Sequence, residues 1–205
     1  MRRYCFFGML LLLLQGCTLA EVRVNVVSER TALENQVLGS YNALSQDVLL
    51  AASVRGTDPL GRIQVPPRKS REHQDVIEAM QALAFHADDV DSFKRLVWVG
   101  ENNEGLLRTF PMGKANAPED LKDFTARYQE DEFKAVVHEV NTSREVVMRR
   151  VVETNENFSK ADLPKIRRVF GKINGENALP GEKVQMNDGS WIIKSKPKVA
   201  PSGGK

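Results

Sequence analysis

The stretch FKAVVHEVNTSREVVMRRVV, residues 133–152, decides the class of fold. Its apolar residues recur at steps of three, four and seven, which places them on one face of an α-helix. The residues of this stripe are Phe133, Val136, Val140, Val147 and Val151. A helix with one apolar stripe buries that face against other elements. We therefore expect a long amphipathic helix in a mainly α-helical protein.

The helical pattern extends in both directions from this stretch. It begins at Pro118, where proline suits the first turn because that turn needs no N–H donor, and we expect a kink in the charged stretch 129–132. After a polar interruption, Ser159 or Asp162 can cap a further helix that runs to about Gly175. The C-terminal half thus contains at least two consecutive helices.

The N-terminal half shows the same periodicity. One helical stripe follows Ser28 and stops near Gly56, and shorter ones are predicted at 71–85 and 88–97. Between the first two, the proline- and glycine-rich segment 56–70 predicts a long loop or connector.

The remaining segments predict turns and one hairpin. GENNEG, residues 100–105, has the composition of a turn. Residues 183–186 and 190–193 flank Asn187-Asp188-Gly189, a strong hairpin signal because glycine adopts positive φ without strain. The tail 195–205 lacks a core-forming pattern and should be disordered. The fold class is therefore mainly α, with several amphipathic helices, a small C-terminal β-hairpin and a disordered tail.

The N-terminus has the pattern of an export signal. Arg2 and Arg3 precede the apolar run CFFGMLLLLL, residues 5–14, which is too short for a membrane span of about 20 residues. The run ends at LQGC, residues 14–17, which resembles the bacterial lipobox. This resemblance implies cleavage after Gly16 and attachment of diacylglycerol to the thiol of Cys17. An ordinary secretory signal that happens to carry a cysteine near its cut is the alternative.

The lipobox resemblance also implies a location. In bacterial lipoproteins the freed amine is commonly acylated too, with palmitate as a typical chain, and several chains make a lasting anchor because each buried methylene contributes about 0.8 kcal/mol. Thr18 follows the cysteine where an aspartate would indicate retention in the inner membrane. By similarity to Gram-negative lipoproteins, we expect the protein on the periplasmic face of the outer membrane.

These patterns divide the chain into regions and limit its partners. We expect a signal peptide at 1–16, an anchor and tether at 17–27, an N-terminal helical region at 28–117, a C-terminal helical and hairpin region at 118–194 and the tail at 195–205. Removing the signal peptide takes away two arginines and no acid, and leaves 27 basic and 27 acidic residues. A neutral chain lacks the positive field that nucleic-acid binding requires. Cys5 is lost with the signal peptide, so no disulfide framework remains.

Metal and catalytic motifs are absent from the sequence. The polar cluster HADDVD, residues 86–91, lacks the glycine and distal glutamate of a calcium loop and the converging ligands of a zinc site. Asp88 or Asp89 is more simply an N-cap for the next helix. No nucleophile elbow, His-Glu-x-x-His helix or phosphate loop is present. We expect no metal, no cofactor and no catalytic residue, with an unrecognised hydrolase built on His86 or His138 as an alternative.

The C-terminal half resembles a known envelope family. PGEKVQMNDGSWIIK, residues 180–194, is similar to the C-terminal signature of the YdbL-type family, a domain of unknown function with the pattern P-G-E-x-V, a (D/N)-G turn and x-W-x-x-K. Val140-Asn141, Arg144, Asn155 and the helix from Ser159 match the upstream part of that family in order and spacing. The resemblance covers about residues 133–194, whereas the lipid anchor and residues 21–130 depart from the family pattern.

The family resemblance implies a helical envelope module without known catalysis. Its members are linked to an AsmA-like intermembrane bridge and a small lipoprotein, in a system thought to move phospholipid between membranes. The candidate partner-binding residues are Pro180, Gly181, Glu182, Gly189 and Trp191. Trp191 can either pack within the protein or serve as an exposed anchor for a partner. A peptidoglycan-binding module is the alternative function, since the hairpin with its tryptophan and basic tail could engage the cell wall.

Overall fold

The computed structural model describes residues 30–53, 70–115 and 117–195. From Thr31 onward these residues belong to one compact unit. The predicted signal peptide, the anchor and tether, the Ser28 cap, most of the Pro-rich segment and all but the first residue of the tail lie outside the described residues.

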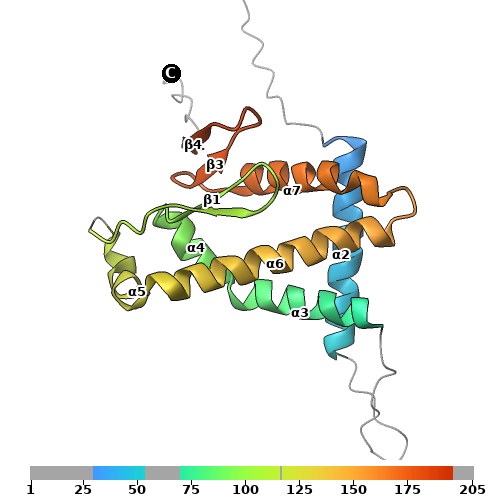
Figure 1. Cartoon of the computed structure of the whole chain (residues 1–205), viewed down its shortest axis with the longest axis horizontal. Coiled ribbons are helices and arrows are strands. Elements are labelled where there is room, and N and C mark those ends of the chain that lie inside the picture. Colours follow the sequence, from blue (N-terminus) through green and yellow to red (C-terminus); the bar gives the residue numbers. More distant parts are fainter. Residues whose placement is uncertain (1–29, 54–69, 116, 196–205) are drawn as a thin grey trace, which may run out of the picture. The chain divides into compact units, whose positions relative to one another are not determined.

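The described part of the chain is mainly α-helical, as predicted, with one small sheet (Figure 1). Its helices are α2 (Ala32–Ser53), α3 (Arg71–Phe85), α4 (Ala87–Arg95), α5 (Lys122–Arg127), α6 (Glu130–Thr154) and α7 (Leu163–Asn177), and single 3₁₀ turns precede α5 (Glu119–Leu121) and α7 (Lys160–Asp162). Its strands are β1 (Val99–Glu101), β2 (Leu107–Thr109), β3 (Lys183–Gln185) and β4 (Trp191–Ile193). Among these helices, none is both long and apolar enough to cross a bilayer.

Helix α6 is the element around which the others pack. It contacts α2, α3, α7 and β2, and Figure 1 shows it between α7 on one side and α3 on the other. Its buried face includes four of the five residues of the predicted stripe; the fifth, Val136, is partly buried, whereas Val137, Met148 and Val152 are buried without having been predicted. That face contributes to two apolar clusters. The first cluster, with α4 and the sheet, contains Val90, Phe93, Trp98, Val99, Leu107, Phe133, Val137 and Val140. The second, with α2 and α7, contains Val37, Leu44, Val151, Val152, Ile166 and Val169.

The sheet is larger than the sequence predicted. Its strand order is β2-β1-β3-β4, with β1 parallel to β3 and the other two pairs antiparallel. The prediction for residues 100–105 was incomplete, because the turn of residues 102–105 joins two strands, β1 and β2. Each of these strands has only three residues, too few for an alternation to be recognised. The parallel pairing of β1 with β3 brings together strands about 80 residues apart and from both sides of residue 117.

The observed helix ends agree in part with the limits and caps predicted from the sequence. Helix α3 has the predicted limits, and the kink expected at 129–132 is a complete break at Tyr128 and Gln129, where the backbone is extended. The Ser159 hydroxyl and backbone N–H both donate to Asp162, and these bonds lower the pKa of Asp162 to about 2. This capping box starts the turn that leads into α7.

Helix α4 differs from its prediction at both ends. The N-cap position is His86, and Asp88 and Asp89 lie inside the first turn instead of capping it. In the first turn, the negative charges of Asp88 and Asp89 stabilise the helix by interacting with the positive end of its dipole. The helix stops at Arg95, two residues early, because Val97 has a φ of +58° that a helix cannot continue through.

Candidate functional site

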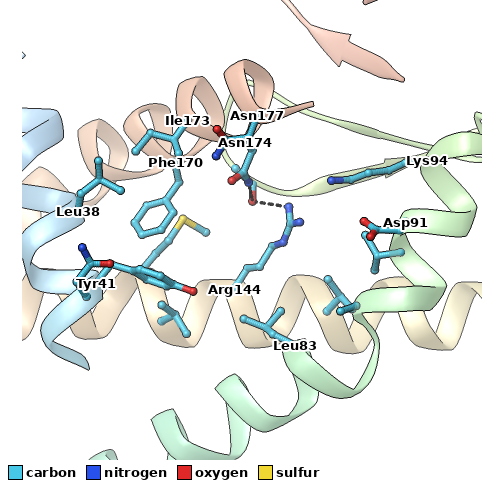
Figure 2. Close-up of a pocket in the computed structure, with 17 residues that line it drawn as sticks. Leu38, Tyr41, Leu83, Asp91, Lys94, Arg144, Phe170, Ile173, Asn174 and Asn177 are labelled. Carbon is cyan, nitrogen blue, oxygen red and sulfur yellow. Dashed lines mark hydrogen bonds between the residues drawn. The ribbon is translucent and has the colours of Figure 1, made fainter. Parts of the chain in front are cut away.

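A hollow of about 420 Å³ lies between α2, α4, α6 and α7 (Figure 2). Its size falls in the range of about 300–1,000 Å³ that is usual for small-molecule sites. Side chains from all four helices and from the end of α3 line it, together with Gly105 of the β1–β2 turn. We call it the interhelical pocket.

One end of the interhelical pocket is apolar. Leu38 and Tyr41 enter from α2, and Phe170 and Ile173 from α7 (Figure 2). Met148 of α6 also lines the pocket. The Tyr41 and Phe170 rings meet edge to face with their centroids 6.1 Å apart. This arrangement gives the end a defined shape, because aromatic pairs prefer such an orientation.

The other end is lined by Lys94, Arg144 and Asn174, and all three contact the carboxylate of Glu101, whose side chain is 2% exposed and does not itself line the pocket. Arg144 donates to both carboxylate oxygens, from Nη1 to Oε2 at 2.6 Å and from Nη2 to Oε1 at 3.0 Å. The Lys94 ammonium lies 2.6 Å from Oε1, and the Asn174 amide donates to Oε2 at 3.2 Å. We call these four residues the Glu101 cluster; they come from β1, α4, α6 and α7 and so tie the sheet to three helices.

The positive charges of this cluster stabilise the ionised form of the Glu101 carboxylate. Burial alone raises the pKa of Glu101, but the positive charges of Arg144 and Lys94 outweigh it and hold that pKa below its ordinary value. Glu101 is therefore a carboxylate at neutral pH, and the cluster of one anion and two cations carries one surplus positive charge. Arg144 also donates to the Gly105 carbonyl at 3.1 Å, which fixes the guanidinium at the pocket wall.

The sequence did not single out Glu101, Lys94 or Asn174 as site residues. Glu101 lies in the segment interpreted as a turn, and its cationic partners are 7 and 43 residues away, so no spacing signal could reveal the cluster. Arg144 did carry a signal, since it is part of the expected match to the YdbL-type pattern. Two other residues of that match also have structural roles here: the Asn141 amide exchanges two hydrogen bonds with Leu107 of β2, and the Asn155 amide donates to the Ser40 hydroxyl.

The predicted partner-binding residues gather in the C-terminal hairpin, where the first three form a tight turn. The Glu182 N–H donates to the Leu179 carbonyl at 3.1 Å across Pro180 and Gly181, and Gly181 has a φ of +97°. Proline followed by a residue of positive φ defines a type II turn. The Glu182 carboxylate is buried and accepts the Leu179 N–H at 3.0 Å, so its contact is internal to the turn.

Gly189 and Trp191 belong to the other end of the hairpin. Gly189 has a φ of +86° and donates to the Met186 carbonyl, which closes the predicted turn. Trp191 is half-buried and meets Phe110 edge to face, with 5.0 Å between the ring centroids. The Lys183 ammonium lies 3.7 Å from the centre of the same Phe110 ring. Trp191 thus packs within the protein and is exposed in part.

The two edges of the sheet differ. At β2, the side chain of Asn141 occupies the backbone N–H and C=O of Leu107. At β4, the bonds between Glu182 and Lys194 and between Met186 and Ser190 set the register with β3. In an antiparallel pair, hydrogen-bonded and non-hydrogen-bonded positions alternate, so the backbone groups of Trp191 and Ile193 point away from β3. No described strand pairs with that side of β4.

The two candidate histidines have different surroundings in the structure. His86 is buried, with Nε2 at 3.1 Å from Glu139 and Nδ1 at 3.5 Å from Asp89, while His138 is exposed on α6. No group of three or more metal-ligating side chains occurs in the described part of the chain. Neither histidine lines the interhelical pocket.

Gly16 and Cys17, the predicted cleavage and lipidation residues, lie outside the described residues. Searches against protein-family models, curated proteins and solved structures find no match to this chain.

Proposed function

We propose that the protein is a lipoprotein of the outer membrane, anchored through Cys17 and facing the periplasm, that docks without catalysis onto another envelope protein. The lipobox-like sequence LQGC at 14–17 supports the anchor. The resemblance of residues 133–194 to the YdbL-type family supports a role in envelope maintenance, through intermembrane phospholipid transport. The docking surface is the outer edge of β4.

The exposed apolar side chains of the hairpin carry this proposal. Of the six exposed large apolar side chains among the described residues, four belong to residues 179–193. They are Leu179, Met186, Ile192 and Ile193, and Leu179 and Ile193 are 61% and 50% exposed. Solvent-exposed apolar groups beside an edge strand promote aggregation unless a partner covers them.

The partner that fits this edge is an extended segment with apolar residues at alternate positions. Such a segment adds a strand to a sheet through main-chain hydrogen bonds, while side-chain contacts provide specificity. The outward N–H and C=O groups of Trp191 and Ile193 supply the main-chain bonds. The resemblance implies an AsmA-like bridge or a small lipoprotein as the source of the strand.

Replacing Ile193 by proline tests the proposed docking mode. The outward N–H of Ile193 is not used within the hairpin, so proline removes a donor for the partner and leaves the β3–β4 bonds intact. With a photo-crosslinking residue at Ser195 in living cells, we expect a discrete adduct that Ile193→Pro reduces about tenfold, as the loss of one buried hydrogen bond of about 1.4 kcal/mol predicts.

The matched control places the same crosslinker at Gln74, an exposed residue of α3 far along the chain from the hairpin. Thermal unfolding of the Ile193→Pro variant verifies that the protein still folds. Equal adducts from both positions, or an adduct at Ser195 that is insensitive to the proline in a folded variant, would refute docking at β4.

A cell-wall module is the second candidate function, favoured by the half-exposed Trp191 ring beside Phe110. Aromatic rings on an open face suit stacking against sugars. Sedimentation with purified peptidoglycan separates the two candidates, because docking onto a protein strand predicts that the chain stays in the supernatant.

A further inference from the structure

The interhelical pocket is amphipathic along its length. Figure 2 shows Leu38, Tyr41 and Phe170 together at the α2 side, with Lys94 at the opposite side and Arg144 between them. A ligand that fills this space must therefore have an apolar part and a polar part at opposite ends.

The polar end favours an anion. The Glu101 cluster holds two cations against one carboxylate, and only one of the three N–H groups of Lys94 is needed for its contact with Glu101. Asp91 is the other charged residue of the pocket lining; because it is exposed, water and salt weaken its negative charge, which therefore offsets the surplus only in part. An anionic group beside Lys94 and Arg144 would compensate the surplus positive charge of the cluster.

A second hollow adjoins the interhelical pocket. Tyr41 and Leu83 line both the interhelical pocket and an adjoining hollow of about 440 Å³ between α2 and α3. This second hollow reaches Met80 and Leu49, and Leu49 is 66% exposed at its outer end. The two hollows share the side chains of Tyr41 and Leu83 and between them reach from the cationic cluster to the exposed Leu49; we call the two together the apolar path.

We infer that this path binds a single acyl chain that ends in an anionic group, either a carboxylate or a phosphate. The anionic group contacts Lys94 and Arg144, and the chain passes Tyr41 and Leu83 toward Leu49. A fatty acid and a lysophospholipid both have this chemistry. This inference deepens the proposed function by naming a ligand. It rests on the proposed function in one respect, which is that the protein lies in an envelope that contains such amphiphiles.

Photo-crosslinking with lipid probes tests the inference on the full chain in isolated envelope membranes. The probes are a palmitate analogue with a diazirine near its methyl end, the lysophosphatidylglycerol that carries the same chain, and the neutral monoacylglycerol. We expect both anionic probes to label peptides of α2 and α3 that line the path, and the neutral probe to label them at least about tenfold less, because it lacks a charge-assisted contact. Labelling by only one of the anionic probes would show whether the anionic group of the ligand is a carboxylate or a phosphate.

Substitutions at exposed lining residues separate binding from folding. Asp91→Asn removes a negative charge near Lys94 and should strengthen labelling about threefold, whereas Asn177→Asp adds one and should weaken it by a similar factor. Glu156→Gln, an exposed change outside the pocket, is the matched control and should have no effect. Leu38→Trp fills the apolar end and should abolish labelling.

The outcomes distinguish this inference from the proposed function. Equal labelling by the neutral probe, labelling outside the path, or no response to the Asp91 and Asn177 variants would overturn the inference. If the chain fractionates away from the envelope, the proposed anchoring is overturned, and labelling in the soluble fraction decides the ligand inference by itself.

Discussion

Replacement of Arg144 by methionine should lower the free energy of unfolding by about 3–5 kcal/mol, the usual effect of removing one partner of a buried ion pair. Methionine keeps much of the side-chain length but leaves Glu101 with Lys94 as its only charged partner. The Glu101 side chain is 2% exposed, so water cannot replace the guanidinium. Urea unfolding at pH 7 measures the change.

Two further variants identify the cause of this loss. Lys122→Met removes the cation of the exposed Glu119–Lys122 pair and should cost less than about 1 kcal/mol. Adding both Glu101→Gln and Lys94→Met to Arg144→Met removes every charge of the cluster and should restore at least half of the lost stability. A triple variant as unstable as Arg144→Met alone would show that the loss comes from packing and that the charge balance of the cluster is unimportant.

Replacement of Gly171 by alanine should cost about 3 kcal/mol or more, at the upper end of what overpacking usually costs. Gly171 lies in α7 against the β1–β2 turn, and a Cβ there would come within 2.4 Å of the Asn103 carbonyl carbon and oxygen. Backbone atoms cannot move aside as a flexible side chain can, so α7 and the turn must separate. This separation would also pull Asn174 away from Glu101.

The same helix provides the control for this prediction. At Gly175 an added Cβ meets no atom within 4 Å, so Gly175→Ala should leave stability unchanged or raise it by up to about 1 kcal/mol through helix propensity. Thermal or urea unfolding of the two variants gives the comparison. Similar effects at the two positions would contradict the close contact of α7 with the β1–β2 turn.

Local signals in the sequence were sufficient for much of the fold. The apolar stripe of α6, the limits of α3 and the turn at Gly189 each depend on residues close together in the chain, and each was predicted. Strands β1 and β2 were missed because three residues cannot display an alternation, and because β1 acquires its second neighbour only from β3. The sheet is completed by the pairing of β1 with β3, which are too far apart in the chain for a short stretch of sequence to predict it.

The candidate site could be predicted only in part. The hairpin residues were chosen as partner-binding candidates from the expected family resemblance, and that role stays a prediction, although Glu182 proves to be buried within its own turn. The Glu101 cluster was not predicted, because its members come from four separate elements and only Arg144 belonged to a pattern noted in the sequence. A buried carboxylate with two cations is a property of the folded protein that residue spacing does not encode.

Intact-mass and peptide mass spectrometry of the protein isolated from a Gram-negative envelope is the most direct measurement of the proposed anchoring. We predict a chain whose first residue is Cys17, with a diacylglyceryl thioether on the sulfur and an acyl group on the amine. A mature chain that starts at any other residue, or that carries Cys17 with a free thiol, would contradict it.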